Sequence, residues 1–235
     1  MTAGAGTIAI TKASSPDPRL TSVHAGIERY YTDKVMMHGA TALGADWTCR
    51  PTQELRFVQL LKLCDFRQAL SLNDVGCGYG ALLAFLEKRH RRAEVDYLGT
   101  DLSQAMIDQA KPSLHPNIRA RFVVAGSIPR VADYSVASGI FNVKLAQSAA
   151  RWDLFIKKTL GEMNAASRLG FAVNFLAPLE PDMHVIPELY RASPDVWIRY
   201  CERQFSATAE LISGYGMREF TLLVRRQCRS GLACR

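Results

Sequence analysis

The stretch SLNDVGCGYG, Ser71–Gly80, decides the fold of this chain together with the ALLAFLEKRH segment that follows it. A short apolar run leads into glycines at positions 76, 78 and 80, and an amphipathic run comes next. This order predicts a strand, a tight glycine turn and a helix, the first crossover of a nucleotide-binding α/β domain. Glycine permits the unusual backbone angles of such a turn and the close approach of a ligand, and the helix start offers unpaired N–H groups.

An acidic residue stands at the end of the next predicted strand. Glu94–Thr100 has the composition of that strand, and Asp101 follows it, about 21 residues after Gly80. This is close to the spacing expected for a carboxylate that binds ribose hydroxyls. The pattern Gly-x-Gly-x-x-Ala also fits the turn, so the glycines alone leave a nicotinamide cofactor open.

The segment DVGCGYG resembles motif I of the class I S-adenosylmethionine (SAM) methyltransferases, which carry an acidic residue at the position of Asp74. The resemblance covers roughly residues 30–226 and implies SAM as the cofactor, with the turn holding its methionine end and Asp101 its ribose. Cys77 lies inside the turn, and we interpret it as a packing residue, not as a nucleophile. The cofactor-binding residues expected on these two segments are Asp74, Gly76, Cys77, Gly78, Gly80, Asp101 and Leu102.

The remaining periodicities complete an α/β domain. Amphipathic or apolar runs bounded by glycine, proline or serine predict two helices before the first strand, further strands and helices after the second, and a hairpin around Gly214-Tyr215-Gly216. The predicted helices cover 21–38, 52–64, 103–112, 148–167 and 193–203, and the further strands cover 119–125, 134–140, 169–176, 205–213 and 217–226.

By its resemblance, the domain is a Rossmann-like, doubly wound sheet of mostly parallel strands, with a C-terminal antiparallel hairpin and an N-terminal helical lid. The closing hairpin is a further feature of class I methyltransferases, and it favours SAM over NAD. The expected organisation is a disordered tail over 1–20, the helical lid over 21–66, the SAM-binding domain over 67–226 and a flexible tail over 227–235.

Three side chains of the lid are candidates for the site. The segment HGATALGADW followed by QELRF resembles a bacterial group of these enzymes, and Arg56 is placed on that second segment. Its guanidinium could clamp the SAM carboxylate bidentately, or it could lie on a solvated helix face. Tyr30 and Tyr31 could cover the sulfonium by cation–π contact, or pack half-buried on the helix.

The ends of the third and fourth predicted strands supply further candidates, because ligands of doubly wound sheets sit beyond the carboxyl ends of the strands. Ser127 stands where many class I enzymes place an adenine-binding aspartate, and the backbone of Ile128 could substitute for that contact. Gly139 and Phe141 are placed to meet the methionine part of SAM. Asn142 is an active-site candidate, with a helix N-cap as the alternative.

The proline-containing segment 177–192 is predicted to form an irregular insertion after the fifth strand. Substrate specificity segments are often placed there in this fold. His184 and Tyr190 are the acid–base candidates in it, although a surface or packing role is the more usual one for such residues. Asn174 interrupts the apolar strand before this insertion. A buried amide needs partners, so Asn174 is expected either in the core or on the pocket floor.

Composition limits the class of protein. The net charge is +7, but the basic residues cluster near a helix end and at the C-terminus without interleaved aromatics, so we expect no nucleic-acid partner. The six cysteines and five histidines lack metal-ligand spacing, and no metal is expected. No apolar run is long enough to span a membrane, and free thiols suit a reducing cytoplasm.

The expected partner is therefore a small-molecule substrate, and the sequence leaves the oligomeric state open. The resemblance implies methyl transfer to an oxygen or nitrogen nucleophile, with release of S-adenosylhomocysteine (SAH). An alternative is intramolecular cyclisation of SAM to azetidine-2-carboxylate with release of methylthioadenosine, because bacterial synthases of that compound use a methyltransferase-like fold. A non-catalytic SAM-binding protein is a third alternative.

Overall fold

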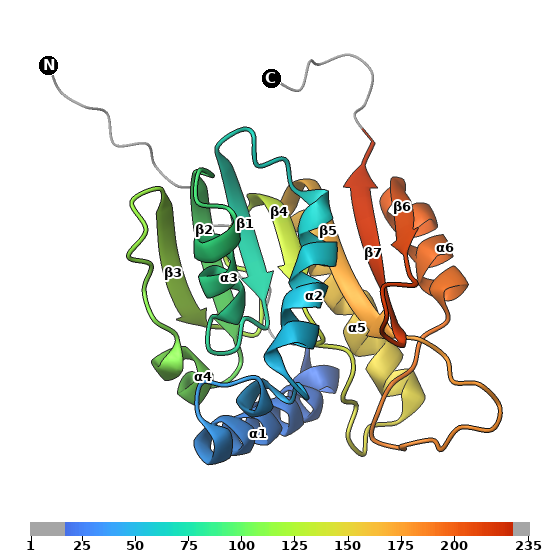
Figure 1. Ribbon diagram of the computed structural model, residues 1–235. Coiled ribbons are helices and arrows are strands. Elements are labelled where there is room, and N and C mark those ends of the chain that lie inside the picture. The colour runs from blue at the N-terminus through green and yellow to red at the C-terminus, as the bar shows by residue number, and fades with distance from the viewer. Residues whose placement is uncertain (1–16, 228–235) are drawn as a thin grey trace, which may run out of the picture.

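The computed structural model describes residues 17–227, and the central element is one seven-stranded sheet in the order β3-β2-β1-β4-β5-β7-β6 (Figure 1). The first five strands run parallel, and β7 is antiparallel to both of its neighbours. The predicted mostly parallel sheet with a C-terminal hairpin is thus confirmed. The strands are β1 (Leu70–Val75), β2 (Val95–Asp101), β3 (Ile118–Val124), β4 (Ala132–Ala137), β5 (Ser167–Leu176), β6 (Ala207–Ile212) and β7 (Glu219–Arg226).

Helices cover both faces of the sheet (Figure 1). The α2 and α3 helices pack on one face and α5 and α6 on the other, while α1 crosses the carboxyl ends of the parallel strands. The helices are α1 (Thr21–His38), α2 (Arg50–Leu60), α3 (Ala81–Arg89), α4 (Gln104–Gln109), α5 (Ala149–Ala165) and α6 (Pro194–Phe205), with short 3-10 turns η1 (Pro18–Leu20), η2 (Leu43–Ala45) and η3 (Leu61–Leu63).

Alternation along the strands divides the core into two layers. On β5, Phe171, Val173 and Phe175 pack toward α5 and α6, whereas Ala172 packs toward α2 and α3. Successive side chains of a strand point to opposite faces, so an almost continuous apolar run supplies both layers. The β5 strand is therefore buried on both faces of the sheet.

The helix boundaries follow local chemistry. Ser103 caps α4 by accepting a hydrogen bond from the Met106 backbone N–H (3.2 Å), and Ser148 caps α5 in the same way. The predicted second helix begins earlier than expected, at Arg50, because Pro51 occupies its first turn, where a missing N–H costs nothing. It ends earlier as well, since residues 61–63 tighten into η3.

The chain between β3 and β4 contains no helix. The space on that face is used by η1 and the start of α1, whose Leu20 and Val23 are buried against α5. The expected tail over 1–20 is therefore too long by at least three residues, since Pro18–Leu20 is ordered structure. The rest of that expected tail, 1–16, and the residues 228–235 lie outside the described part of the chain.

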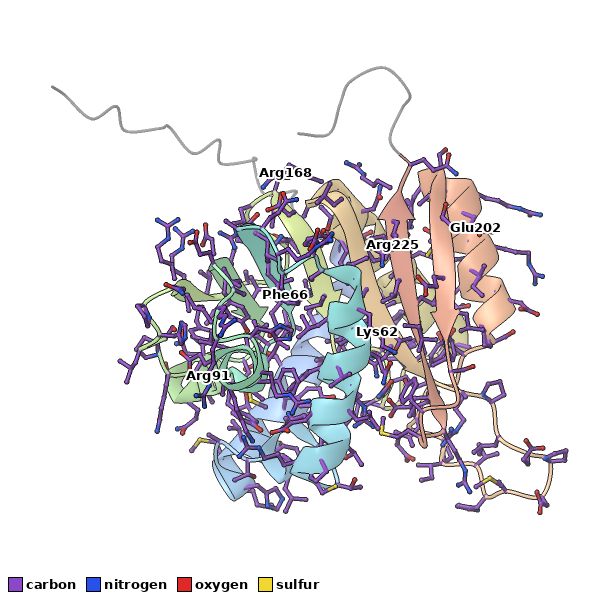
Figure 2. The ribbon with its side chains drawn as sticks, turned by 45° about the horizontal axis from the view of Figure 1, so that its top comes forward. Lys62, Phe66, Arg91, Arg168, Glu202 and Arg225 are labelled. Atoms are coloured by element: carbon purple, nitrogen blue, oxygen red, sulfur yellow. The ribbon has the colours of Figure 1, made fainter. Side chains whose placement is uncertain are left out.

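The end of the sheet opposite α1 carries several arginines (Figure 2). Arg168 forms an ion pair with Asp133 (Nε–Oδ1 2.9 Å), and Arg225 donates to the backbone carbonyls of Lys62 (3.2 Å) and Leu63 (3.0 Å). The Arg225 contacts bind the end of β7 to the segment before β1, and the Arg168 pair joins β5 to β4, so part of the basic charge has a structural use. Over residues 17–227, no helix has the length and apolar character that crossing a membrane requires.

Candidate functional site

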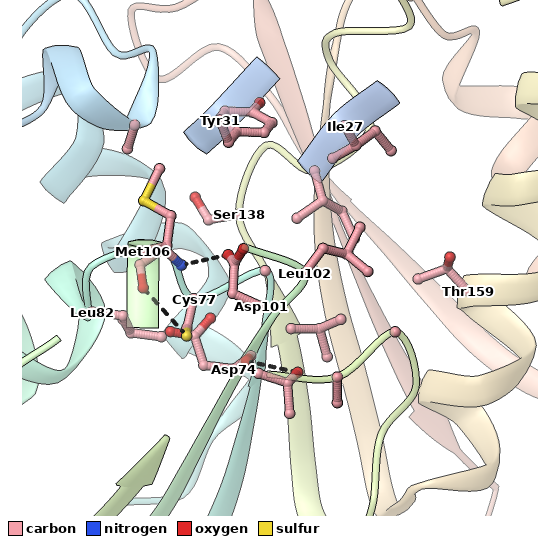
Figure 3. A pocket seen from close by; sticks show the side chains of 18 of the residues that line it. Ile27, Tyr31, Asp74, Cys77, Leu82, Asp101, Leu102, Met106, Ser138 and Thr159 are labelled. Carbon is pink, nitrogen blue, oxygen red and sulfur yellow. Dashed lines mark hydrogen bonds between the residues drawn. The ribbon is translucent and has the colours of Figure 1, made fainter. Parts of the chain in front are cut away.

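A pocket lies at the carboxyl ends of β1, β2 and β4, underneath α1 (Figure 3). Ile27 and Tyr31 of α1 face Asp74, Cys77 and Asp101 across it. The pocket therefore brings together residues from both predicted motif segments and from the predicted lid. The sequence-predicted residues that line it are Tyr31, Asp74, Gly76, Cys77, Gly78, Asp101, Leu102, Ser127 and Ile128.

The glycine turn forms the floor beside β1. All three glycines have positive φ, as the turn required. A Cβ at Gly76 would come within 2.3 Å of Ile140 Cγ2, so a larger residue there would displace the turn after β4. Gly80 is the N-cap residue of α3 and does not line the pocket. Burial raises the pKa of the Cys77 thiol, which keeps this side chain protonated and agrees with a packing role.

Asp101 is held in one orientation by two backbone donors. Its Oδ2 accepts from the Gly78 N–H (2.9 Å) and its Oδ1 from the Ser103 N–H (2.9 Å). Burial raises the pKa of the carboxyl, and these backbone N–H groups act against that rise. A carboxylate fixed in this way, with lone pairs left over, is well suited to accept hydrogen bonds from a ligand.

Asp74 is a buried residue in the floor of the pocket. The Tyr97 hydroxyl donates to its Oδ2 (2.5 Å), and burial raises the pKa of this carboxyl from 3.8 to about 7, with the nearby Asp101 charge adding to the rise. The folded protein thus holds Asp74 protonated over a pH range in which the unfolded chain ionises it.

This shift makes the stability of the protein depend on pH. A raised carboxyl pKa favours folding fully below pH 3.8 and loses that contribution as the pH rises through about 7. Asp74→Asn keeps an acceptor for Tyr97 and carries no charge, so it should raise the free energy of unfolding at pH 8. The gain should shrink steadily from pH 7 toward pH 4. Denaturant unfolding of both proteins at several pH values measures this; a gain independent of pH would contradict the assignment.

Ser138 is a pocket residue that the sequence analysis did not identify. It follows β4, and its buried Oγ has no hydrogen-bond partner within residues 17–227. A buried hydroxyl without a partner is uncommon, and here it faces a pocket. Gln53 and Trp47 are further lining residues that were not singled out for this role. One signal was available, because Ser138 directly precedes the predicted Gly139.

The two neighbouring tyrosines of α1 lie in different surroundings. Tyr31 lines the pocket, and burial raises the pKa of its phenol, so its hydroxyl stays protonated. Tyr30 lies outside the lining and donates its hydroxyl to Asp46 Oδ2 (2.8 Å), beside the Lys34–Asp46 ion pair. The rings meet edge to face with centroids 5.2 Å apart. Only Tyr31 is placed to contact a ligand in this pocket.

Arg56 lies outside the pocket lining and is not on a solvated face. It forms a buried ion pair with Glu219, donating from Nε to Oε2 (2.7 Å) and from Nη2 to Oε1. Its third nitrogen donates to the Thr52 carbonyl (2.9 Å), and the guanidinium stacks on the Trp47 ring at 3.9 Å. With its donors used in this way, Arg56 supports Trp47, which does line the pocket.

Hydrogen bonds connect Glu219 of this ion pair to the turn after β4. The Asn174 amide donates to Glu219 Oε2 (3.1 Å) and its Oδ1 accepts from the Gly139 N–H (2.8 Å). A Cβ at Gly139 would lie 2.1 Å from the Trp47 ring, so the turn and the tryptophan are in close contact. Asn174 is therefore a satisfied core amide, and Gly139 acts on the pocket through Trp47.

Three further predicted residues lie away from the pocket. Phe141 is buried in the core, stacked on Phe175 with centroids 5.2 Å apart. Asn142 is buried beside it and does not cap a helix, since Ser148 caps α5. The Tyr190 hydroxyl donates to Asp153 (3.0 Å), and its backbone N–H donates to the Asn142 carbonyl (2.8 Å). The insertion therefore contacts the turn after β4 through its backbone.

Comparison with known sequences identifies the central segment. Residues 73–166 match a family model described as a methyltransferase domain. Rv1506c from Mycobacterium tuberculosis, whose name assigns it provisionally to the methyltransferases, is 40% identical over 166 residues. That alignment covers 71% of this chain and 99% of the relative.

Solved structures share the fold at low sequence identity. Magnesium protoporphyrin IX methyltransferase from Synechocystis PCC 6803, solved with bound SAM, has a TM-score of 0.59 and 13% identity, over 92% of this chain and 100% of that one. Human N-acetylserotonin methyltransferase, in complex with SAM, has a TM-score of 0.58 and 13% identity, over 89% of this chain and 60% of that one.

Proposed function

Because the chain belongs to the class I SAM-dependent methyltransferase family, we propose that it binds SAM in this pocket and transfers the methyl group to an oxygen or nitrogen of a small molecule. The observation that carries the proposal is the half-buried Asp101 carboxylate, held by Gly78 and Ser103 in the pocket wall. Its free lone pairs suit the two hydroxyls of a ribose.

The residues beside Asp101 fit the rest of the ligand. A Cβ at Gly78 would meet nothing closer than the Met106 sulfur at 3.8 Å, so the backbone is open to close approach. Ser138 offers a hydroxyl that has no hydrogen-bond partner among residues 17–227. These groups suit the charged amino-acid part of SAM, and Gly76, Cys77 and Gly78 would hold it together with Asp74.

Bound SAM supplies a methyl group already activated by a sulfonium. The task of the protein is then to align the acceptor and to exclude water, since orientation supplies much of the rate enhancement in such transfers. The Tyr31 ring, placed on α1 across the pocket from the turn, offers an aromatic face to a cation. Its phenol stays protonated, so it acts as a wall and hydrogen-bond donor and not as a base.

Product analysis tests the proposal. Purified protein is incubated with SAM and pooled small molecules that carry hydroxyl or amine groups, and products are followed by mass spectrometry. SAH together with a methylated acceptor is expected, and both should be absent with Asp101→Asn. Methylthioadenosine and a four-membered amino acid, formed from SAM alone, would instead establish the cyclisation. SAM that binds and stays intact with every acceptor would favour a non-catalytic role.

A further inference from the structure

The pocket has a second end that the sequence analysis did not foresee. Beyond Leu102 and Ile128 it continues between α1 and α5, where His24, Phe155, Thr159 and Glu162 line it. Thr159 lies well to the side of Asp74 and Asp101 in Figure 3. This end exists because no helix fills the connection between β3 and β4, so that α1 lies directly against α5.

The walls of this end suit a flat apolar group. Leu102, Ile128 and Phe155 line it, and His24 meets the Phe155 ring edge to face with centroids 5.8 Å apart. Burial and the charge of Lys158 lower the pKa of His24, so its ring is neutral at pH 7. A ligand held by its ribose at Asp101 would direct its base into this apolar end and its charged part toward the glycine turn.

Two polar side chains of α5 at this end, Thr159 and Glu162, are available as hydrogen-bond acceptors. The Thr159 hydroxyl donates its hydrogen bond to the Phe155 carbonyl (2.9 Å), so its oxygen lone pairs remain free to accept one from a ligand. Glu162 is about one helical turn further along α5, and its carboxylate accepts no hydrogen bond within the described residues; Lys158 Nζ lies 3.9 Å from its Oε1. An edge that presents N–H groups would be matched by such a pair.

We propose that Glu162 accepts a hydrogen bond from the exocyclic amino group of the SAM adenine, so that the base is recognised from α5. The inference rests on the proposed function, since it requires SAM in this pocket. The segment after β3, Gly126-Ser127-Ile128-Pro129, carries no carboxylate, and its Ile128 supplies a wall. Partial burial raises the pKa of Glu162, as expected for a carboxyl turned away from bulk water.

The competing role for Glu162 is a helix-surface ion pair with Lys158, four residues earlier on α5. Both side chains are about a quarter exposed (26% for Lys158 and 24% for Glu162), and such pairs contribute little to stability. The two roles differ in one respect. Only an adenine contact makes Glu162 sensitive to the atom at position 6 of the purine.

The test is calorimetric titration of the purified full chain with SAH and with S-inosylhomocysteine, in which a keto oxygen replaces the amino group at position 6 and N1 carries a proton. The wild type should prefer SAH by roughly tenfold to a hundredfold, the range expected for a hydrogen bond to a charged group. In Glu162→Gln the preference should fall to near one or reverse, because an amide can donate to the keto oxygen. Lys158→Gln is the matched control and should keep the wild-type preference.

Three outcomes would overturn the inference. An unchanged preference in Glu162→Gln, with both ligands bound, would remove Glu162 from the adenine site. An equal loss in Lys158→Gln would assign the effect to the surface pair. Failure of the wild type to bind SAH at all would overturn the proposed function itself, so the two failures are distinguishable. Thermal unfolding of each variant checks that the fold is retained.

Discussion

Arg56→Met will lower the free energy of unfolding by about 3–5 kcal/mol, the usual cost of removing one member of a buried ion pair. Glu219 would remain buried with the Asn174 amide as its remaining partner, and burying an unpaired charge is expensive. The same change removes the stack on Trp47, so affinity for SAH should fall as well. Urea unfolding gives the first quantity, and calorimetry well below the melting temperature gives the second.

The same helix offers a matched control. Arg50 pairs with Glu54 on the surface of α2, with 67% of the Arg50 side chain exposed. Arg50→Met should change stability by less than about 1 kcal/mol, as exposed pairs do. The double replacement of Arg56 by Met and Glu219 by Leu should recover much of the loss, because no buried charge is left. If Arg56→Met lowered the free energy of unfolding as little as Arg50→Met does, the Arg56–Glu219 pair would be solvated and the assignment would be wrong.

Asp101→Asn will weaken SAH binding on the order of a hundredfold or more, if two hydrogen bonds from the ribose to a charged acceptor are lost. The amide has nearly the same shape but carries no charge and can accept at one atom only. One of the two backbone donors, Gly78 or Ser103, would then also face an N–H group. Calorimetry with SAH gives the affinity of both proteins.

Stability should change much less than affinity in this variant. Burial already raises the pKa of Asp101, so a neutral side chain avoids part of the cost of burying a charge and offsets the lost backbone contact. Asp108→Asn, on the exposed side of α4, is the control and should bind SAH as the wild type does. Wild-type affinity in Asp101→Asn would remove this residue from the ribose site.

Much of the architecture could be predicted because its signals are local. The strand–turn–helix unit lies within Ser71–Arg89, and the boundaries predicted for the first helix coincide with those of α1. The hairpin at the C-terminus required only two apolar runs and the Gly214-Tyr215-Gly216 turn between them. In each case, residues adjacent in the chain determine the backbone.

The candidate site was less accessible where partners are distant in sequence. Arg56 pairs with Glu219, 163 residues away, so its own helix could not reveal its role. Asn174 likewise meets Glu219 and Gly139 only in the folded sheet. The second end of the pocket, between α1 and α5, exists because no helix lies between β3 and β4. The amphipathic pattern of 148–167 marks the core stripe, but Thr159 and Glu162 stand beside that stripe.

The way in which α1 is attached has a kinetic consequence. Its middle covers the pocket with Ile27 and Tyr31, but its start is anchored by Val23 and by Leu20 of the preceding η1, which are both 1% exposed in the core beside α5. Lifting the whole helix would expose these two side chains, at about 1.5–3 kcal/mol each. Residence time of a bound ligand should therefore lengthen or shorten with the packing of two residues that never touch it.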